Sequence, residues 1–141
     1  MKRWVKTLSG HRCEWKLPSK VIQGNKRKTS NYHSAAKKLL QETYSTIQIF
    51  EEVPIHTDTL RTLYLDFYIP SLDLAIEVHG EQHYNFSSHF HGSRRKFLKA
   101  RANDRDKITW CELNGIFIAI LSYKESLSQW KEKIVNYEYD R

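Results

Sequence analysis

The sequence predicts an α/β fold in which a mixed β-sheet lies between helices. Apolar residues alternate with other residues over 63–69 and again over 74–79, on either side of a turn at Pro70-Ser71-Leu72-Asp73, which is typical of an antiparallel hairpin. A continuously apolar run, 116–121, predicts a further strand. Segments with helical spacing lie before, between and after these strands, so the expected order is αβββαβα.

The elements before the hairpin are one helix and one strand. A helix is expected over 34–44, where Ala35, Leu39 and Leu40 have helical spacing behind a Ser/Asn-rich start. A first strand is expected over 46–55, which contains Ile47, Ile49 and Val53.

Three elements follow the hairpin. The pattern predicts a second helix over 97–113, which Asn114-Gly115 ends as a C-terminal cap. The strand 116–121 is expected to be buried on both faces. A closing helix over 126–137 carries Leu127, Trp130 and Ile134 at i, i+3 and i+7.

The hairpin gathers polar side chains that suggest a metal site. If the turn is centred between Ser71 and Leu72, the numbers of two residues opposite each other add up to 143. Asp66 then pairs with Glu77, and Tyr64 pairs with His79. Two carboxylates directly opposite each other repel, and a divalent cation between them removes that penalty. The alternative is that these acids are solvated on the polar face of a half-buried hairpin. We favour the metal site because His79 shares the face and Gly80, Gln82 and His83 follow at once.

Two segments carry a resemblance to a known family. The strings LDFYIP and LAIEVHGEQHY, followed later by DRDKITWCELNGI, resemble the PD-(D/E)XK nuclease superfamily, which has a restriction-endonuclease-like core. They look like a branch related to very-short-patch-repair endonucleases and to phage- and intron-associated homing endonucleases. The resemblance covers about 32–121 and implies an enzyme that cleaves DNA with Mg²⁺.

The resemblance assigns roles where residues match the family pattern. Asp66 matches the first metal-binding aspartate and Glu77 the second acid. His79 stands where many members carry a lysine, so His79 and His83 are the expected replacements, with Gln82 beside them in the candidate catalytic set. The resemblance also makes Asp104 and Lys107 helpers from the second helix, although an ordinary i,i+3 ion pair is the alternative.

The residue types suit phosphodiester hydrolysis. Asp66 and Glu77 are hard oxygen ligands of the kind that Mg²⁺ prefers, with Mn²⁺ as a second candidate ion. A histidine titrates near neutral pH and can therefore transfer protons. Two alternatives stay open: a zinc-dependent site built from His79, His83, His89 and His91, and a catalytically inactive DNA-binding protein that retains the fold.

The charge is distributed unevenly along the chain. Residues 1–40 hold eleven Lys or Arg against one acid, whereas residues 41–141 hold twelve against fifteen acids. We therefore divide the chain into a basic N-terminal DNA-binding arm, 1–31, and a nuclease domain, 32–141. Expected contacts with double-stranded DNA come from two basic clusters: Lys26, Arg27 and Lys28 in the arm, and Arg94, Arg95 and Lys96. The alternative is a basic tail that only keeps the protein soluble.

Composition sets the remaining limits. The 141 residues suffice for a proper core, and Cys13 and Cys111 lack the spacing of a zinc knuckle, which argues for reduced thiols inside a cell. No apolar run reaches membrane-spanning length, and 1–17 lacks a signal core. The expectation is a cytoplasmic, phage-type homing endonuclease or repair-like nicking enzyme. Cutting both strands with one site per chain would require a homodimer or sequential nicks.

Overall fold

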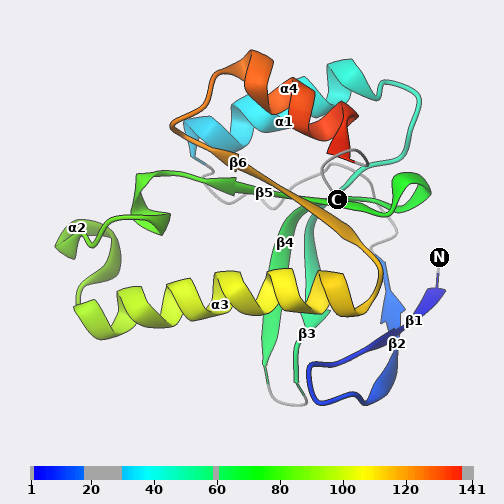
Figure 1. Cartoon of the computed structure of the whole chain (residues 1–141), viewed down its shortest axis with the longest axis horizontal. Helices are drawn as coiled ribbons and strands as arrows, with labels where there is room; N and C mark the ends of the chain where they lie inside the picture. Colours follow the sequence, from blue (N-terminus) through cyan, green and yellow to red (C-terminus); the bar gives the residue numbers. More distant parts are fainter. Residues whose placement is uncertain (1, 18–29, 59–60, 138–141) are drawn as a thin grey trace.

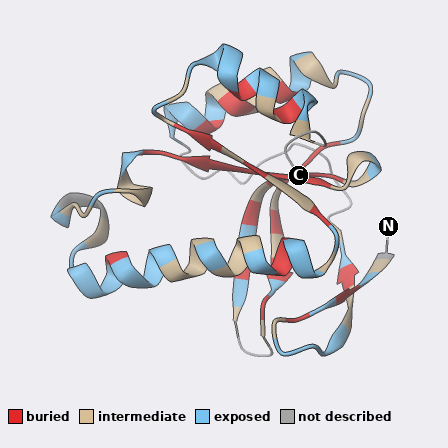
Figure 2. Ribbon diagram, viewed as in Figure 1, coloured by how far each residue is buried: buried red, intermediate tan, exposed pale blue. Residues whose placement is uncertain are grey.

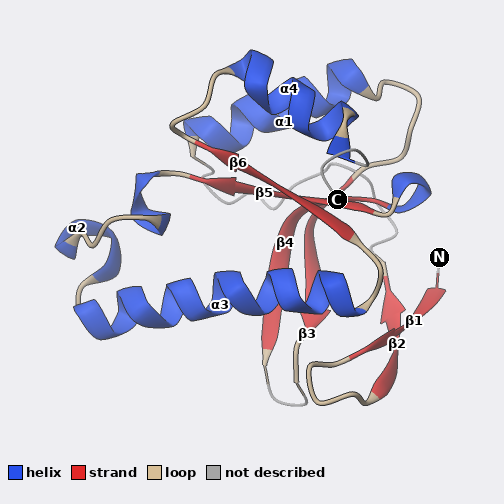
Figure 3. Cartoon of the chain, viewed as in Figure 1, coloured by secondary structure: helices blue, strands red, loops and turns tan. Residues whose placement is uncertain are grey.

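The computed structural model describes residues 2–17, 30–58 and 61–137. Figures 1 and 3 show the arrangement of its elements. The strands are β1 (Lys2–Lys6), β2 (Arg12–Lys16), β3 (Phe50–His56), β4 (Thr62–Ile69), β5 (Leu74–His79) and β6 (Phe117–Ser122). The helices are α1 (Asn31–Thr43), the short α2 (Ser88–His91), α3 (Arg94–Leu113) and α4 (Leu127–Val135).

The main sheet is mixed and lies between helices, which confirms the predicted fold class. Its strand order is β3-β4-β5-β6, with β5 and β6 parallel and the other neighbours antiparallel. α1 and α4 cover one face, while α3 runs along the other (Figure 1). Apart from α2, the order from α1 to α4 is the predicted αβββαβα.

The hairpin of β4 and β5 has the predicted register. Phe67 pairs with Ile76, Tyr68 with Ala75 and Ile69 with Leu74, and each pair sums to 143. The ladder between these strands does not extend to Tyr64 and His79, because β4 and β5 separate beyond Phe67 and Ile76. This separation opens the sheet at the level of Asp66 and Glu77.

The prediction that β5 is a half-buried strand is wrong. All six of its residues are buried, as the continuous red of β5 in Figure 2 shows. The reason is that α3 packs Trp110 and Cys111 over one face while α1 and α4 pack Leu40 and Trp130 over the other. Glu77 and His79 therefore lie under a helix and not in open solvent.

β4 also departs from a simple alternation. Leu63 and Leu65 pack with Trp110, but Phe67 and Ile69 pack in the cluster formed with α1 and α4. The change of side occurs at Asp66. The ladder between β3 and β4 skips Asp66 and also Glu52 of β3, whose φ of 50° is unusual for a non-glycine residue in a strand. Local distortion of both strands therefore coincides with the candidate site.

The C-terminal end of α3 confirms the predicted cap. Gly115 has a φ of 68°, its N–H donates to the carbonyl of Glu112, and the N–H of Ile116 donates to the carbonyl of Cys111. This is the Schellman arrangement, in which a left-handed residue ends the helix. It sends the chain directly into β6.

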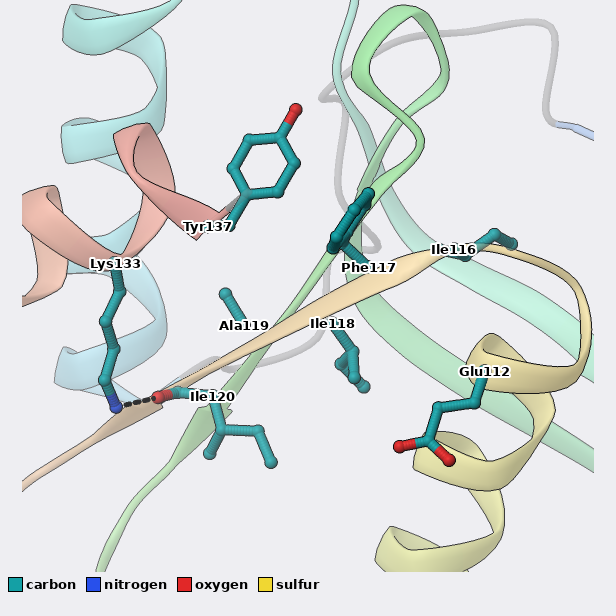
Figure 4. Close-up of a pocket in the computed structure, with 8 residues that line it drawn as sticks. All are labelled: Glu112, Ile116, Phe117, Ile118, Ala119, Ile120, Lys133 and Tyr137. Atoms are coloured by element: carbon teal, nitrogen blue, oxygen red, sulfur yellow. Dashed lines mark hydrogen bonds between the residues drawn. The ribbon is translucent and has the colours of Figure 1, made fainter. Parts of the chain in front are cut away.

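β6 is an edge strand, so the prediction of burial on both faces is only partly correct. Ala119 and Leu121 are buried, but Ile118 and Ile120 are half-buried and line a hollow of about 480 Å³ between the ends of α3 and α4. Figure 4 shows this hollow, with the Lys133 ammonium donating to the carbonyl of Ile120. At the start of α4, Leu127 is exposed, whereas Trp130 and Ile134 are buried as expected.

The N-terminal residues form a hairpin that shares the core of the main sheet. β1 and β2 pair antiparallel, and Trp15 is buried against Tyr68 and Trp110, with ring centroids 4.7 and 5.0 Å away. Arg3 binds Asp73, Tyr68 and the carbonyl of Asn114. The basic residues Lys26, Arg27 and Lys28 lie outside the described residues. No helix in the described ranges is long and apolar enough to cross a membrane.

Candidate active site

Asp66 and Glu77 meet where β4 and β5 separate. The Asp66 N–H donates to Glu77 Oε2 over 3.0 Å, and the Val78 N–H donates to Asp66 Oδ2 over 2.8 Å. The two carboxylates thus satisfy backbone groups that the ladder leaves without strand partners. One oxygen of each side chain, Asp66 Oδ1 and Glu77 Oε1, is left for other contacts.

Burial is the main reason why the pKa values of both acids are raised. Burial raises the pKa of Asp66, in spite of hydrogen bonds from the Val78 N–H and with Glu77. Burial, and next the charge of Asp66, raise the pKa of Glu77 to about 8. Two adjacent carboxylates in a largely enclosed place disfavour their own ionisation, and this is the electrostatic condition that a bound cation relieves.

Lys107 brings an ammonium group to this pair from α3. Its Nζ lies 2.7 Å from Glu77 Oε1, and both side chains are largely buried. Burial alone would lower the pKa of Lys107, but Glu77 outweighs it and the pKa is raised, so the amine stays charged.

His83 pairs with Asp104 beside the carboxylates. His83 Nδ1 lies 2.9 Å from Asp104 Oδ2. Burial would raise the pKa of Asp104, but the hydrogen bond from His83 lowers it overall, so Asp104 is an ionised acceptor. The proton of a neutral His83 is therefore on Nδ1, and its Nε2 is able to accept a proton. Asp104 and Lys107 each bind a different partner and do not form the i,i+3 pair considered above as an alternative.

The ring of His79 lies against the ring of His83. The two rings stack with centroids 4.1 Å apart and planes 2° apart. His79 is buried, and its Nε2 has no hydrogen-bond partner among the described residues. Burial, and then His83, lower the pKa of His79, so this ring is neutral. His79, His83 and Asp104 each offer a ligand atom within 4.8 Å of the others, the one such group of three found in the described ranges.

The site opens onto a groove between α3 and the sheet. The groove, about 310 Å³, is lined by Asp66 from β4, Glu52 from β3 and a row on α3. The row consists of Ala100, Asn103, Asp104 and Lys107, which share one face of the helix. Lys96 continues this face toward the helix start, with Arg94 and Arg95 exposed beside it.

The other predicted residues have less direct places. The side chain of Gln82 folds over Gly80, where an added Cβ would lie 2.6 Å from Gln82 Oε1. The backbone carbonyl oxygen of Gln82 lies 2.8 Å from His91 Nε2. His91 therefore holds a loop and lies outside the ligand group. Nothing is described of the His89 side chain.

Sequence reasoning missed a second set of polar residues on the α1 side of the sheet. His33 and Lys37 of α1 contact Glu51 of β3 at 2.9 Å each, and His33 Nδ1 lies 3.8 Å from Asp66 Oδ1. The spacing of His33 and Lys37, one helical turn apart, was the available signal. Nothing in the sequence shows that Glu51, and not Glu42 on the exposed side of α1, is their partner.

Comparisons with known proteins give viral relatives. The chain is 40% identical over 70 residues to uncharacterized protein 094L of Frog virus 3 (isolate Goorha), covering 49% of this chain and 45% of that protein. It is 34% identical over 61 residues to uncharacterized protein 307L of Invertebrate iridescent virus 6, covering 43% and 31%. It is 30% identical over 70 residues to uncharacterized protein 033L of Invertebrate iridescent virus 3, covering 50% and 36%.

The matched segment thus spans less than half the length of each of these relatives. No family model matches the chain. No solved structure matches it either.

Proposed function

We propose that this chain is a Mg²⁺-dependent DNA endonuclease. The observation that carries the proposal is the meeting of Asp66, Glu77 and Lys107 where β4 and β5 separate, open to a groove. Two acids with raised pKa values and one charged amine are the groups that phosphodiester hydrolysis needs in one place. The three residues come from β4, β5 and α3, so the packing of α3 on the sheet is what brings them together.

The donor set fits a hard divalent cation. Asp66 and Glu77 would hold Mg²⁺, or Mn²⁺, through carboxylate oxygens. When bound, such an ion neutralises charge on the phosphate and lowers the pKa of bound water. Lys107 places a positive charge beside Glu77, where it would bind a phosphoryl oxygen and stabilise the developing charge.

His83 is the best candidate for proton transfer. Asp104 fixes its Nδ1–H, which leaves Nε2 to take a proton from the attacking water or to give one to the leaving oxygen. His79 would support His83 through the stacked ring contact. The sequence alone placed His79 first, whereas the contacts favour His83.

DNA would lie along α3. Arg94, Arg95 and Lys96 occupy the first turn of this helix, where a cation is electrostatically unfavourable for the helix itself. At a rise of about 1.5 Å per residue, Arg94 lies about 15 Å along the helix axis from Asp104. This distance is roughly half a turn of duplex DNA. Such a cluster is well placed to contact phosphates flanking the scissile bond.

The zinc-dependent alternative rests on the group of His79, His83 and Asp104. The nearly parallel, stacked rings argue against it, because the nitrogen lone pairs lie in the ring planes and do not converge on one ion without rotation. If Zn²⁺ and not Mg²⁺ supports cleavage, this alternative replaces the main proposal.

A plasmid nicking assay with and without Mg²⁺ tests the function. We expect Asp66→Asn and Glu77→Gln each to lower the cleavage rate about a hundredfold or more, since each removes a ligand, while DNA affinity measured in Ca²⁺ changes little. Glu132→Gln, at an exposed position on α4, serves as the matched control. Full cleavage in either site variant contradicts the assignment. DNA binding without any cleavage by the parent protein favours the inactive DNA-binding alternative.

A further inference from the structure

The α1 side of the sheet holds a histidine in a fixed orientation next to Asp66. His33 is in the first turn of α1, and its N–H donates to the capping Ser30 hydroxyl. Its ring is buried and stacks on Phe67, with centroids 4.7 Å apart and planes 28° apart. Neither the motif in the hairpin nor the proposed roles above account for this residue.

Glu51 determines which His33 nitrogen carries a proton. His33 Nε2 lies 2.9 Å from Glu51 Oε1, and Lys37 Nζ lies 2.9 Å from Glu51 Oε2. Burial would raise the pKa of Glu51, but hydrogen bonds from Lys37 and His33 lower it overall. An ionised carboxylate only accepts, so the Nε2 of His33 is the donor. In a neutral ring the lone pair is then on Nδ1.

Nδ1 faces an oxygen that the rest of the site leaves available. It lies 3.8 Å from Asp66 Oδ1, which is too far for a direct hydrogen bond. The other oxygen of Asp66 already accepts from the Val78 N–H. Two donors bound to one ion at about 2.1 Å each can be at most about 4.2 Å apart, so this pair is within reach of a shared cation.

We propose that His33 Nδ1 is a ligand, together with Asp66 Oδ1, of the divalent cation in the active site, and that this nitrogen makes the site prefer Mn²⁺ to Mg²⁺. This inference rests on the proposed function, since it assumes that Asp66 binds the catalytic ion. Mg²⁺ strongly prefers oxygen ligands, whereas imidazole suits transition metals. The Lys37–Glu51 pair acts on the ion through His33, by fixing the ring as an Nε2 donor.

Mn²⁺ binding to the purified protein tests this ligand without DNA. Electron spin-echo measurements on bound Mn²⁺ detect a directly coordinated ¹⁴N, and we expect that signal in the parent protein. His33→Gln keeps a donor near the Nε2 position but removes Nδ1. It should lose the ¹⁴N signal and bind Mn²⁺ at least about tenfold more weakly, with a smaller change for Mg²⁺ measured by competition.

Two further variants control the experiment. His11→Gln, at an exposed position in the turn of the β1–β2 hairpin, should leave the signal and both affinities unchanged. His33→Asn places an amide oxygen near the Nδ1 position, so Mn²⁺ should still bind but without the ¹⁴N signal. Thermal unfolding of each variant shows whether the fold is retained.

The outcomes separate this inference from the proposed function. If folded His33→Gln keeps the ¹⁴N signal and the Mn²⁺ affinity, His33 is not a ligand. If the signal disappears in His83→Gln instead, the nitrogen comes from the His79, His83 and Asp104 group and the inference is overturned. If Asp66→Asn binds Mn²⁺ as tightly as the parent protein, the metal site of the proposed function is itself wrong, and the inference fails with it.

Discussion

At the scale of single residues, Glu77 is an acid whose charge is costly to the fold, because burial and Asp66 raise its pKa. Its pKa is raised from 4.5 to about 8, so between these values the folded protein binds more protons than the unfolded chain. The free energy of unfolding contributed by Glu77 therefore falls as pH rises from about 4.5 to about 8. A bound divalent cation would offset this loss, because it favours the ionised carboxylate.

Glu77→Gln should remove this pH dependence. A neutral amide has no charge to bury, so the stability of the variant relative to the parent protein should rise between pH 5 and pH 8, on the order of a few kcal/mol. Denaturant unfolding at the two pH values without added metal measures the difference. Glu132→Gln is the exposed control and should show no such change. An equal difference at both pH values would mean that Glu77 is ionised throughout and that Lys107 fully offsets its burial.

The histidines allow a second prediction at this scale. His83→Gln should lower the cleavage rate about a hundredfold, because it removes the nitrogen that Asp104 leaves able to accept a proton. His79→Gln should also lower the rate, but less, because His79 acts through its stacking on His83. Single-turnover nicking between pH 6 and pH 9 measures both, with His56→Gln as an exposed control. If both variants cleave at the rate of the parent protein, neither histidine transfers the proton, and Lys107 becomes the next candidate.

At the scale of elements, α3 carries residues of both the candidate active site and the proposed DNA-binding cluster. Asp104 and Lys107 lie toward its middle, and Arg94, Arg95 and Lys96 lie in its first turn. Replacing these three cations by Gln should weaken DNA binding uniformly across sequences and reduce the slope of log affinity against log salt by about one for each phosphate that the variant no longer neutralises. Titrations at several salt concentrations measure this slope. Lys131→Gln on α4 is the control, and an unchanged slope in the triple variant would place the phosphate-binding residues elsewhere.

The elements were predictable to the extent that local signals determine them. The hairpin register followed from its turn, and the end of α3 followed from Asn114-Gly115, because both depend on neighbouring residues. The full burial of β5 did not follow, since it depends on α3 packing from far along the sequence. The β1–β2 hairpin had a signal in Ser9-Gly10 between two runs with tryptophan, but the high charge obscured it.

In the candidate site, too, the residue types were predictable from the sequence, but their contacts across the fold were not. Asp66, Glu77, His83, Asp104 and Lys107 were identified from the sequence because the motif and its resemblance cover them. Their actual pairings, Glu77 with Lys107 and His83 with Asp104, needed the packing of α3 on the sheet. His33 and Glu51 were missed because their relation to Asp66 exists only after α1 packs against β3 and β4.

At the scale of the whole molecule, the N-terminal hairpin belongs to the core that supports α3. Trp15 is 3% exposed, contacts Tyr68 and Trp110, and donates from its ring nitrogen to the carbonyl of Pro54. Removing residues 1–30 would therefore expose this core, so a truncation cannot separate DNA binding from folding. Single substitutions in the hairpin instead measure how much it contributes to folding.

Trp15→Ala should lower the free energy of unfolding by about 3–5 kcal/mol, because it leaves a cavity between β3, β4 and α3. Trp4→Ala is the matched control: Trp4 is 64% exposed beside Arg12, so its loss should change stability by no more than about 0.5 kcal/mol. Denaturant unfolding measures both. If Trp15→Ala proves as stable as Trp4→Ala, the hairpin is an independent appendage and the position of α3 does not depend on it. If Trp15→Ala is destabilised because the hairpin supports α3, the molecules that remain folded should also cleave DNA more slowly. The reason is that Trp110, which contacts Trp15, lies one turn from Lys107 on the same helix.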